Sequence, residues 1–232
     1  NPVFSNDGKQ LLFGQQAIEH FYADKVVMSL YDIQTKQTIR LTDHIDLSCE
    51  QWFWSADDKT IYFIAEHNAM NSIFSISARG GNHNLLFHSG TNNGAALAGK
   101  NILVFTHHNL SAPAEIFKLD LRKGNVLKIT GFNDNIVNSI AWGKVEDITY
   151  KGANDADVQM FIVYPPDYDP SKKYPMVMLI HGGPHGTFGD QFHFRWNAQL
   201  FAAPGYIVVM PNFHGSTSFG PDFAISIHGA HS

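Results

Sequence analysis

The amino-acid sequence predicts a chain of two unlike parts, an all-β region followed by an α/β region. Three observations support this prediction. A pattern of short strands recurs through residues 4–130, it then stops, and two apolar strand-like segments separated by a helical segment follow it. We place the boundary at residue 140, so the two predicted domains are residues 1–140 and 141–232.

The recurring pattern begins in the same way three times, at Phe4–Phe13, at Trp54–Phe63 and, more weakly, at Leu97–Phe105. Each copy is followed by two further strand-like runs. Short alternating strands separated by Asp-Gly, Asp-Asp or Gly-Gly at a period of about 40–50 residues are typical of β-propeller blades. A four-stranded blade cannot cover both its faces, so neighbouring blades stack around an axis. A closed propeller needs at least ~4 blades, and we therefore expect a partial propeller here.

The second region begins with a predicted hairpin, in which Val145–Tyr150 and Val158–Tyr164 flank a loop rich in Gly, Asn and Asp. The proline-containing segment 165–173 cannot be helical. It leads into the apolar run Met176–Ile180. An unbroken apolar run of this length predicts a strand buried on both faces, as in parallel sheets covered by helices.

A helix and a second apolar strand follow. Residues Phe192–Ala203 predict a helix that Pro204-Gly205 ends, and Tyr206–Met210 predict another buried strand. A strand, a helix and a strand in succession predict a right-handed crossover in a parallel sheet. The loop Asn212–Gly220 then lies at the carboxyl edge of the sheet, where α/β proteins place their ligand sites. We expect Phe223–Ile227 to begin a further helix.

The sequence His181-Gly182-Gly183-Pro184 ends the first apolar strand. Glycine adopts backbone angles that are closed to other residues, so the chain can turn sharply and present bare amide N–H groups. An oxyanion hole needs such donors about 3 Å from a developing negative charge. A loop of this type follows the third strand of α/β-hydrolases. The alternative is a tight connection that has no chemical role.

The composition excludes several functional classes. The net charge is −5 without a basic cluster, which argues against nucleic acid as a partner. No apolar run approaches the ~20 residues of a membrane span. The thirteen histidines form no HExxH motif, and there is no CxxC, so we expect no metal and no cofactor. Cys49 is the only cysteine, which fits a periplasmic, secreted or cytoplasmic protein equally.

Five motifs in one order carry a resemblance to a known family. They are Glu146–Gly152, Val163–Pro166, Tyr174-Pro175 with His181–His185, Phe194–Gln199, and Asn212–Ser216. In this order the chain resembles the prolyl oligopeptidase family of serine peptidases, and in particular its acylaminoacyl-peptidase and dipeptidyl-peptidase-V-like branch. The resemblance implies an α/β-hydrolase domain that a propeller caps, and short peptides as substrates.

The resemblance also implies roles for particular residues. Gly183, with Gly182, would donate to the oxyanion, and His181 occupies the place where some relatives carry a tyrosine whose hydroxyl does so. The alternative for His181 is a hydrogen-bonded residue that shapes the loop. Phe213 would contact the substrate. Glu115 lies in a predicted blade that faces the hydrolase region, and this position makes it a candidate to bind a peptide's free amino terminus. The alternative for Glu115 is a solvated carboxylate at a blade edge.

The departures from the family are equally informative. No Gly-x-Ser-x-Gly occurs in the 232 residues, and Ser216 and Ser218 lie in the wrong frame, so we assign none of the catalytic triad to this chain. The match fades at residues 230–232, where we expect Asp-Trp-Gly. We therefore expect an internal piece of a longer protein, ending before the nucleophile and inactive alone, in which Met176–Ile180 becomes a sheet edge. The alternatives are a non-catalytic propeller module with a vestigial hydrolase half, and an esterase.

Overall fold

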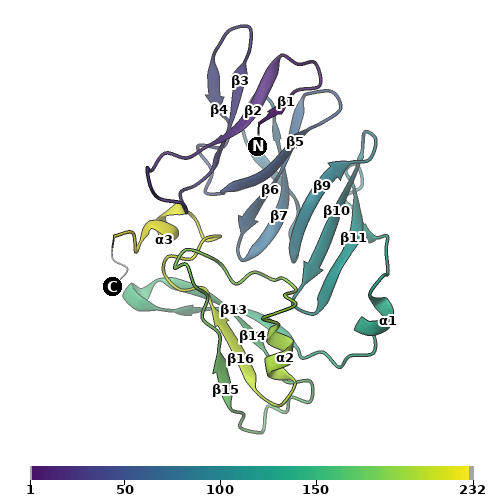
Figure 1. Ribbon diagram of the computed structural model, residues 1–232, viewed down its shortest axis with the longest axis vertical. Helices are drawn as coiled ribbons and strands as arrows, with labels where there is room; N and C mark the ends of the chain where they lie inside the picture. The colour runs from purple at the N-terminus through teal and green to yellow at the C-terminus, as the bar shows by residue number, and fades with distance from the viewer. Residues whose placement is uncertain (1, 230–232) are drawn as a thin grey trace.

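The computed structural model describes residues 2–229, so the departure that the sequence shows at residues 230–232 lies outside the described part. Strands β1–β12 precede residue 130 and form three four-stranded antiparallel units. Figure 1 shows the second unit between the first and the third. The second and third units are joined by a single parallel pair, Asn71 with Thr91. In the described residues no strand pairing joins the first unit to either of the others.

Each unit is a meander of four consecutive strands, and we call these units the first, second and third sheets. The first consists of β1 (Val3–Phe4), β2 (Gln10–Gln15), β3 (Val27–Asp32) and β4 (Thr38–Arg40). The second consists of β5 (Cys49–Trp54), β6 (Thr60–His67), β7 (Met70–Ser77) and β8 (His83–Phe87). The third consists of β9 (Thr91–Leu97), β10 (Ile102–Asn109), β11 (Ala112–Asp120) and β12 (Val126–Lys128).

The middle strands of the second sheet are buried on both faces. On β6, Ile61 and Phe63 join a core shared with Leu12 and Met28 of the first sheet. Ile64, which points to the opposite face, joins a core shared with Leu103 and Phe105 of the third sheet, among other residues. Because successive side chains of a strand point to opposite faces, this alternation stacks the three sheets against one another.

The recurrence in the sequence has a structural counterpart in the turn that precedes β2 and the turn that precedes β6. In the first turn the Ser5 hydroxyl donates to Asp7 (2.8 Å) and accepts from the Gln10 amide (3.0 Å). In the second turn Ser55 makes the same two bonds, to Asp57 (2.8 Å) and from the Thr60 amide (3.0 Å). The two segments therefore form the same turn with the same hydrogen bonds.

The second region contains one mixed sheet in the order β13-β14-β16-β15. The predicted hairpin is confirmed, since β13 (Val145–Lys151) pairs antiparallel with β14 (Asp157–Val163) around the 3₁₀ turn Ala153–Asp155. The predicted parallel pair is also confirmed, since β15 (Met176–Met178) runs parallel to β16 (Ile207–Pro211). We call this sheet the mixed sheet.

The strand after Tyr174-Pro175 was predicted to be buried on both faces, and this prediction is wrong. β15 pairs with β16 alone and forms an edge, so Met176, Met178 and Ile180 are exposed by 60%, 51% and 69%. The expectation that this segment becomes a sheet edge is confirmed. An apolar edge of this kind is a template for further strand pairing.

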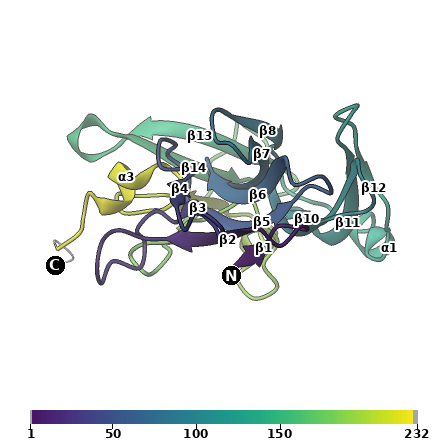
Figure 2. The same ribbon diagram turned by 90° about the horizontal axis from the view of Figure 1, so that it is seen from above.

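The helices are shorter than the sequence predicts. Residues 192–196 are not helical, and α2 covers only Ala198–Ala202, because Asn197 caps it with a bond from the Gln199 amide to its side chain (2.9 Å). The helix expected from Phe223 begins earlier, as α3 (Pro221–Ile225), with a proline in its first turn. The third helix, α1 (Asp134–Val137), lies between β12 and β13. Seen from above, α1 and α3 lie at opposite ends of the molecule (Figure 2).

The mixed sheet docks onto the turns at one end of the stacked sheets. Asp190 makes three of these contacts: its amide donates to the Ala69 carbonyl (2.8 Å), its carbonyl accepts from the Thr91 hydroxyl (3.0 Å), and its carboxylate accepts from the Leu110 amide (2.9 Å). Ala69 and Leu110 also belong to the hydrophobic core of the mixed sheet. Within the described part, no helix has the length and apolarity that crossing a membrane requires.

Candidate active site

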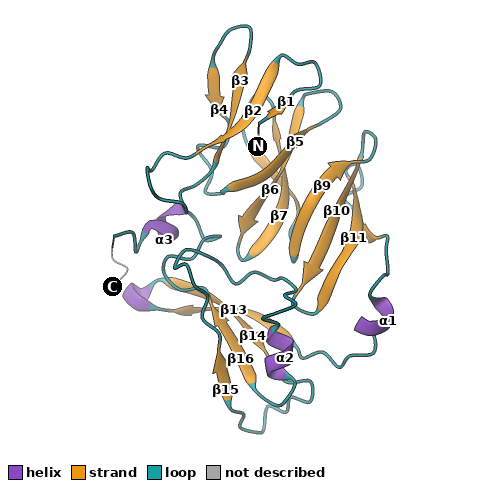
Figure 3. Cartoon of the chain, in the orientation of Figure 1, coloured by secondary structure: helices purple, strands orange, loops and turns teal. Residues whose placement is uncertain are grey.

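Two loops leave the carboxyl ends of the adjacent parallel strands. The first, residues 181–189, follows β15 and is here called the glycine loop; the second, residues 212–220, follows β16 and is called the Asn212 loop. Because neighbouring parallel strands end at the same edge of a sheet, the two loops lie together. Figure 3 shows loops between the mixed sheet and the stacked sheets, where the two regions meet.

The glycine loop presents two backbone amides that have no acceptor in the part of the chain that the structure describes. Among the described residues, neither the Gly182 nor the Gly183 amide donates a hydrogen bond, and the loop belongs to no helix or strand. Gly183 has a φ of +132°, and a Cβ atom there would lie 2.7 Å from the backbone nitrogen of His185. Only glycine fits this position, whereas a Cβ atom on Gly182 would meet nothing within 4 Å.

His181 is held on four sides. Its Nδ1 donates to the Gly182 carbonyl (3.1 Å), so its Nε2 accepts from the Ser216 hydroxyl (2.9 Å) when the ring is neutral. The ring stacks on Phe213, with centroids 4.4 Å apart, and meets the edge of Phe188 at 5.3 Å. Burial lowers the pKa of His181, although the Gly182 carbonyl opposes this shift, so the ring is neutral at pH 7. These contacts favour the loop-shaping alternative for His181.

Ser216 and His181 have the spacing of a nucleophile and its base, but Ser216 is completely buried. A substrate carbonyl cannot reach a hydroxyl that is closed to solvent. Ser218 is also occupied, because its hydroxyl accepts from the Ala69 amide (2.8 Å). Neither serine is therefore placed to attack a substrate.

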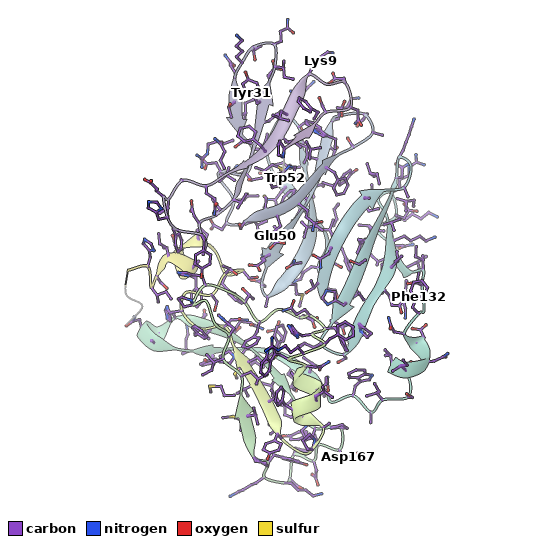
Figure 4. All side chains as sticks on the ribbon, in the orientation of Figure 1. Lys9, Tyr31, Glu50, Trp52, Phe132 and Asp167 are labelled. Atoms are coloured by element: carbon purple, nitrogen blue, oxygen red, sulfur yellow. The ribbon has the colours of Figure 1, made fainter. Side chains whose placement is uncertain are left out.

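Phe213 lies in the site, because it stacks on His181 beside the glycine loop. Glu115 lies elsewhere: its carboxylate accepts from the Thr130 hydroxyl and from the Asn133 amide (2.7 Å) and side chain (3.0 Å). It is 5% exposed, so the alternative of a solvated carboxylate is wrong. Phe132, the residue before Asn133, lies at the outer edge of the molecule (Figure 4). These contacts give Glu115 a structural role, and its binding of an amino terminus stays a prediction.

The hydrogen bonds of Glu115 also explain its ionisation. Burial raises the pKa of this carboxyl, but the bonds from Thr130, Asn133 and the Phe132 amide together bring the pKa below its ordinary value. Glu115 is therefore a charged group that is already satisfied inside the fold.

Three cavities adjoin one another along the junction of the two regions. A cleft of about 430 Å³ is lined by the glycine loop and by Ile180 and Trp196 among others. A small cavity of about 110 Å³ shares Thr187, Gly189 and Gln191 with it. That cavity in turn shares Glu66 and Ser218 with a recess of about 210 Å³. The small cavity therefore lies between the recess and the cleft, and it shares lining residues with each of them.

Glu50 and Glu66, which the sequence analysis missed, line the recess. Desolvation in the recess and the charge of Glu66 raise the pKa of Glu50 to about 7, although the residue as a whole is exposed. Desolvation raises the pKa of the half-buried Glu66, and a bond from Thr217 opposes this shift. None of the ion pairs between described residues involves either carboxylate. Figure 4 shows Glu50 at the end of the stacked sheets that faces the second region. No motif marks the pair, because only the pairing of β5 with β6 makes the two residues neighbours.

The part of the chain that the structure describes holds no group of three or more His, Cys, Asp and Glu side chains that could bind a metal ion. The described site offers backbone amides in the glycine loop and carboxylates in the recess. Preorganised amides stabilise a developing negative charge, and paired carboxylates attract a cation.

The described residues thus combine stacked antiparallel β-sheets with a mixed sheet in which a glycine loop follows a parallel strand. The family model described as "Prolyl oligopeptidase family" (peptidase S9) matches residues 192–231. The chain is 33% identical over 228 residues to a "Probable dipeptidyl-peptidase 5" of Aspergillus clavatus, across 95% of this chain and 31% of the relative. It is 31% identical over 226 residues to the same-named protein of Trichophyton verrucosum, with the same shares covered.

Solved structures share the fold of this chain. An acylaminoacyl peptidase of Pyrococcus horikoshii superposes with a TM-score of 0.80 at 20% identity, over 98% of this chain and 34% of that one. The dipeptidyl peptidase 4 of Porphyromonas gingivalis gives a TM-score of 0.71 at 19% identity, over 97% and 32%. The chain thus belongs to the prolyl oligopeptidase family of S9 peptidases, and it spans about a third of the length of the relatives it matches.

Proposed function

We propose that this chain supplies the oxyanion hole of a serine peptidase together with part of the cap that covers the active site. The observation that carries the proposal is the pair of amides at Gly182 and Gly183, which have no acceptor among the described residues. Gly182 lines a cleft of about 430 Å³, and Gly183 is the next residue of the same loop. Attack of a serine on a peptide carbonyl places negative charge on the carbonyl oxygen, and amide donors lower the energy of that state.

The remaining catalytic groups are not part of this sequence. It has no nucleophile elbow, and its two serines nearest the glycine loop are buried or engaged. In α/β-hydrolases the second oxyanion donor is the amide that follows the nucleophile, and the order of the triad is serine, acid, histidine. We propose that these groups meet the glycine loop at the cleft in the complete protein, and that residues 1–232 alone do not hydrolyse peptides.

The stacked sheets are proposed to be three consecutive blades of a propeller. Two observations support this: each sheet is a four-stranded antiparallel meander, and the second sheet buries apolar residues on both its faces. We propose residues 1–140 as this cap and residues 141–232 as the beginning of the hydrolase domain. A cap of this kind restricts entry to short peptides.

We further propose that the substrates have a free amino terminus. Glu50 and Glu66 line a recess that a small intervening cavity links to the cleft, and neither has a cationic partner in the described part. An α-ammonium group would complete their charge balance and favour their ionised forms. A blocked amino terminus carries no charge, so this feature favours a dipeptidyl peptidase over an acylaminoacyl peptidase.

The test uses the complete product of the gene that encodes this sequence. We expect a fluorophosphonate probe to label it, and we expect it to cleave peptides with a free amino terminus faster than their acetylated forms. Equal cleavage of both forms would contradict the proposed binding of the amino terminus by Glu50 and Glu66. Hydrolysis of p-nitrophenyl esters without peptide cleavage would identify an esterase, and absence of labelling would identify a non-catalytic module.

A further inference from the structure

We infer that Asn212 is a positioning residue that holds the glycine loop in the shape its amides need. The inference rests on the proposed oxyanion role of Gly182 and Gly183. Asn212 is the first residue after β16, and its side chain is completely buried. A buried side-chain amide must have its donors and acceptor satisfied, so its partners indicate what it stabilises.

The side chain of Asn212 binds both backbone groups of one residue in the glycine loop. The Phe188 amide donates to Oδ1 (2.7 Å), and Nδ2 donates to the Phe188 carbonyl (3.0 Å). This is the pair of bonds that one residue of an antiparallel strand makes with its opposite neighbour. The side chain therefore provides a sheet-like attachment for a loop that is not part of any sheet.

A chain of bonds through the mixed sheet fixes the orientation of this amide. Asn212 Nδ2 also donates to Gln159 Oε1 (2.5 Å), and Gln159 Nε2 donates to Asp147 Oδ1 (2.7 Å). The Phe188 amide can only donate and the Asp147 carboxylate can only accept. These two ends therefore fix which group donates and which accepts in each hydrogen bond between them. Gln159 is 8% exposed, which protects these bonds from water.

The attachment reaches the proposed donors through contacts already described. The Phe188 ring packs against the edge of His181, and His181 donates to the Gly182 carbonyl. The loop has no regular secondary structure, so its conformation depends on such tie points. Asn212 therefore acts on Gly182 through Phe188 and His181 without touching the proposed oxyanion site.

If Asn212 only stabilised the fold, its substitution would lower stability, and kcat would recover whenever stability recovers. The fixed donor and acceptor order of these hydrogen bonds allows a double variant that distinguishes this role from the positioning of the glycine loop. Asn212→Asp loses the two N–H donors of Nδ2, so we expect the protein to be less stable and the glycine loop to be less well held. Adding Asp147→Asn lets Gln159 turn its amide over, donate to the new carboxylate at position 212 and accept from the new amide at position 147. The double variant therefore rebuilds the bonds to Gln159 at unchanged net charge. The bond to the Phe188 carbonyl stays broken, because an aspartate cannot donate it.

The experiment measures kcat, KM and the thermal midpoint in the complete gene product, and amide exchange at residues 182–188. We expect about a 10²-fold loss of kcat in Asn212→Asp, since small misplacements of catalytic donors have effects of this size. In Asp147→Asn/Asn212→Asp we expect the midpoint to rise toward wild type, while kcat stays reduced, KM changes little and exchange stays fast. Asp147→Asn alone is the control and should behave like wild type, because an amide oxygen can accept from Gln159.

Recovery of kcat in parallel with the midpoint, or wild-type exchange in the double variant, would overturn the inference. An inactive wild-type protein would instead remove the proposed function. In that case amide exchange alone decides whether Asn212 holds the loop, so the two failures are distinguishable.

Discussion

The turns of the stacked sheets and the glycine loop hold their shapes in opposite ways. The turn before β2 is closed by bonds among Ser5, Asp7 and Gln10, which lie within five residues of one another. The glycine loop is closed by bonds to Asn212 and Ser216, which lie 24 and 35 residues away from their partners. The bonds of Ser5 are local, although the Asn6 and Asp7 amides of the same turn also donate to Asp58 in the turn before β6. The glycine loop takes its conformation from the Asn212 loop, which follows the neighbouring strand β16.

The difference explains why the loop can keep amides open. In the two turns the Gln10 and Thr60 amides donate to the nearby hydroxyls of Ser5 and Ser55. In the glycine loop the Ser216 hydroxyl binds the ring of His181, and the Asn212 side chain binds the amide and the carbonyl of Phe188. The amides of Gly182 and Gly183 have no acceptor in the described part. A preorganised donor costs no rearrangement when charge develops.

The largest expected effect separates two adjacent glycines. Gly183→Ala should lower kcat in the complete gene product by about 10²-fold, because a Cβ atom would lie 2.7 Å from the His185 backbone and displace the donor. Gly182→Ala is the matched control, since its Cβ atom meets nothing within 4 Å. Steady-state kinetics of both variants test this, and equal losses would contradict the assignment of Gly183.

The second effect concerns pH and the stacked sheets. Burial, and the charge of His108 to a lesser degree, lower the pKa of His107 to about 4 from its ordinary value of 6.5. The folded state therefore prefers the neutral ring, and its stability is retained above pH 6.5 and lost as the pH falls toward 4. The loss is on the order of 3 kcal/mol or less.

Urea denaturation between about pH 7.5 and 4 measures this loss. His107→Gln should flatten the pH dependence in that window, whereas His20→Gln, which changes an exposed residue, should leave it as it is. An unchanged slope in His107→Gln would assign the loss of stability to other groups.

The third effect tests the long-range bonds of the glycine loop. Ser216→Ala removes the hydroxyl that donates to His181 and leaves Nε2 without this donor, at a cost of about 1–3 kcal/mol in the free energy of unfolding. Ser226→Ala, in an exposed position, is the control. Thermal denaturation compares the two, and we expect faster amide exchange at residues 182–186 only in Ser216→Ala.

The smallest effect tests the local turns. Ser5→Ala and Ser55→Ala should each lower the free energy of unfolding by about 1 kcal/mol, since each removes one side-chain acceptor from a turn. Because both bonds are local, we expect neither variant to alter kcat in the complete gene product. A change in kcat that matches the effect of Ser216→Ala would contradict the contrast between the two kinds of closure.

Local sequence determined much of this protein. The recurring Ser-x-Asp turns, the Gly/Asn/Asp hairpin loop and the two apolar runs contain their own signals, so the hairpin, the parallel pair and the recurring strands were predictable. The strands β1, β5 and β9 were only partly visible, because the recurring pattern contains just their ends. The glycine loop was found for the same reason, since glycines after an apolar strand indicate a turn.

Tertiary structure alone decided the rest. Met176–Ile180 has the composition of a buried strand, and only the sheet order shows that β15 is an edge. The sequence could not show that Glu115 is structural while Glu50 and Glu66 line a recess. The hydrogen bonds that satisfy Glu115 come from residues 15 and 18 positions away, and the pairing of β5 with β6 brings Glu50 next to Glu66. The attachment of Asn212 to Phe188 is of the same kind. Composition states what a segment prefers, whereas burial and hydrogen-bond partners are set by the neighbours that folding provides.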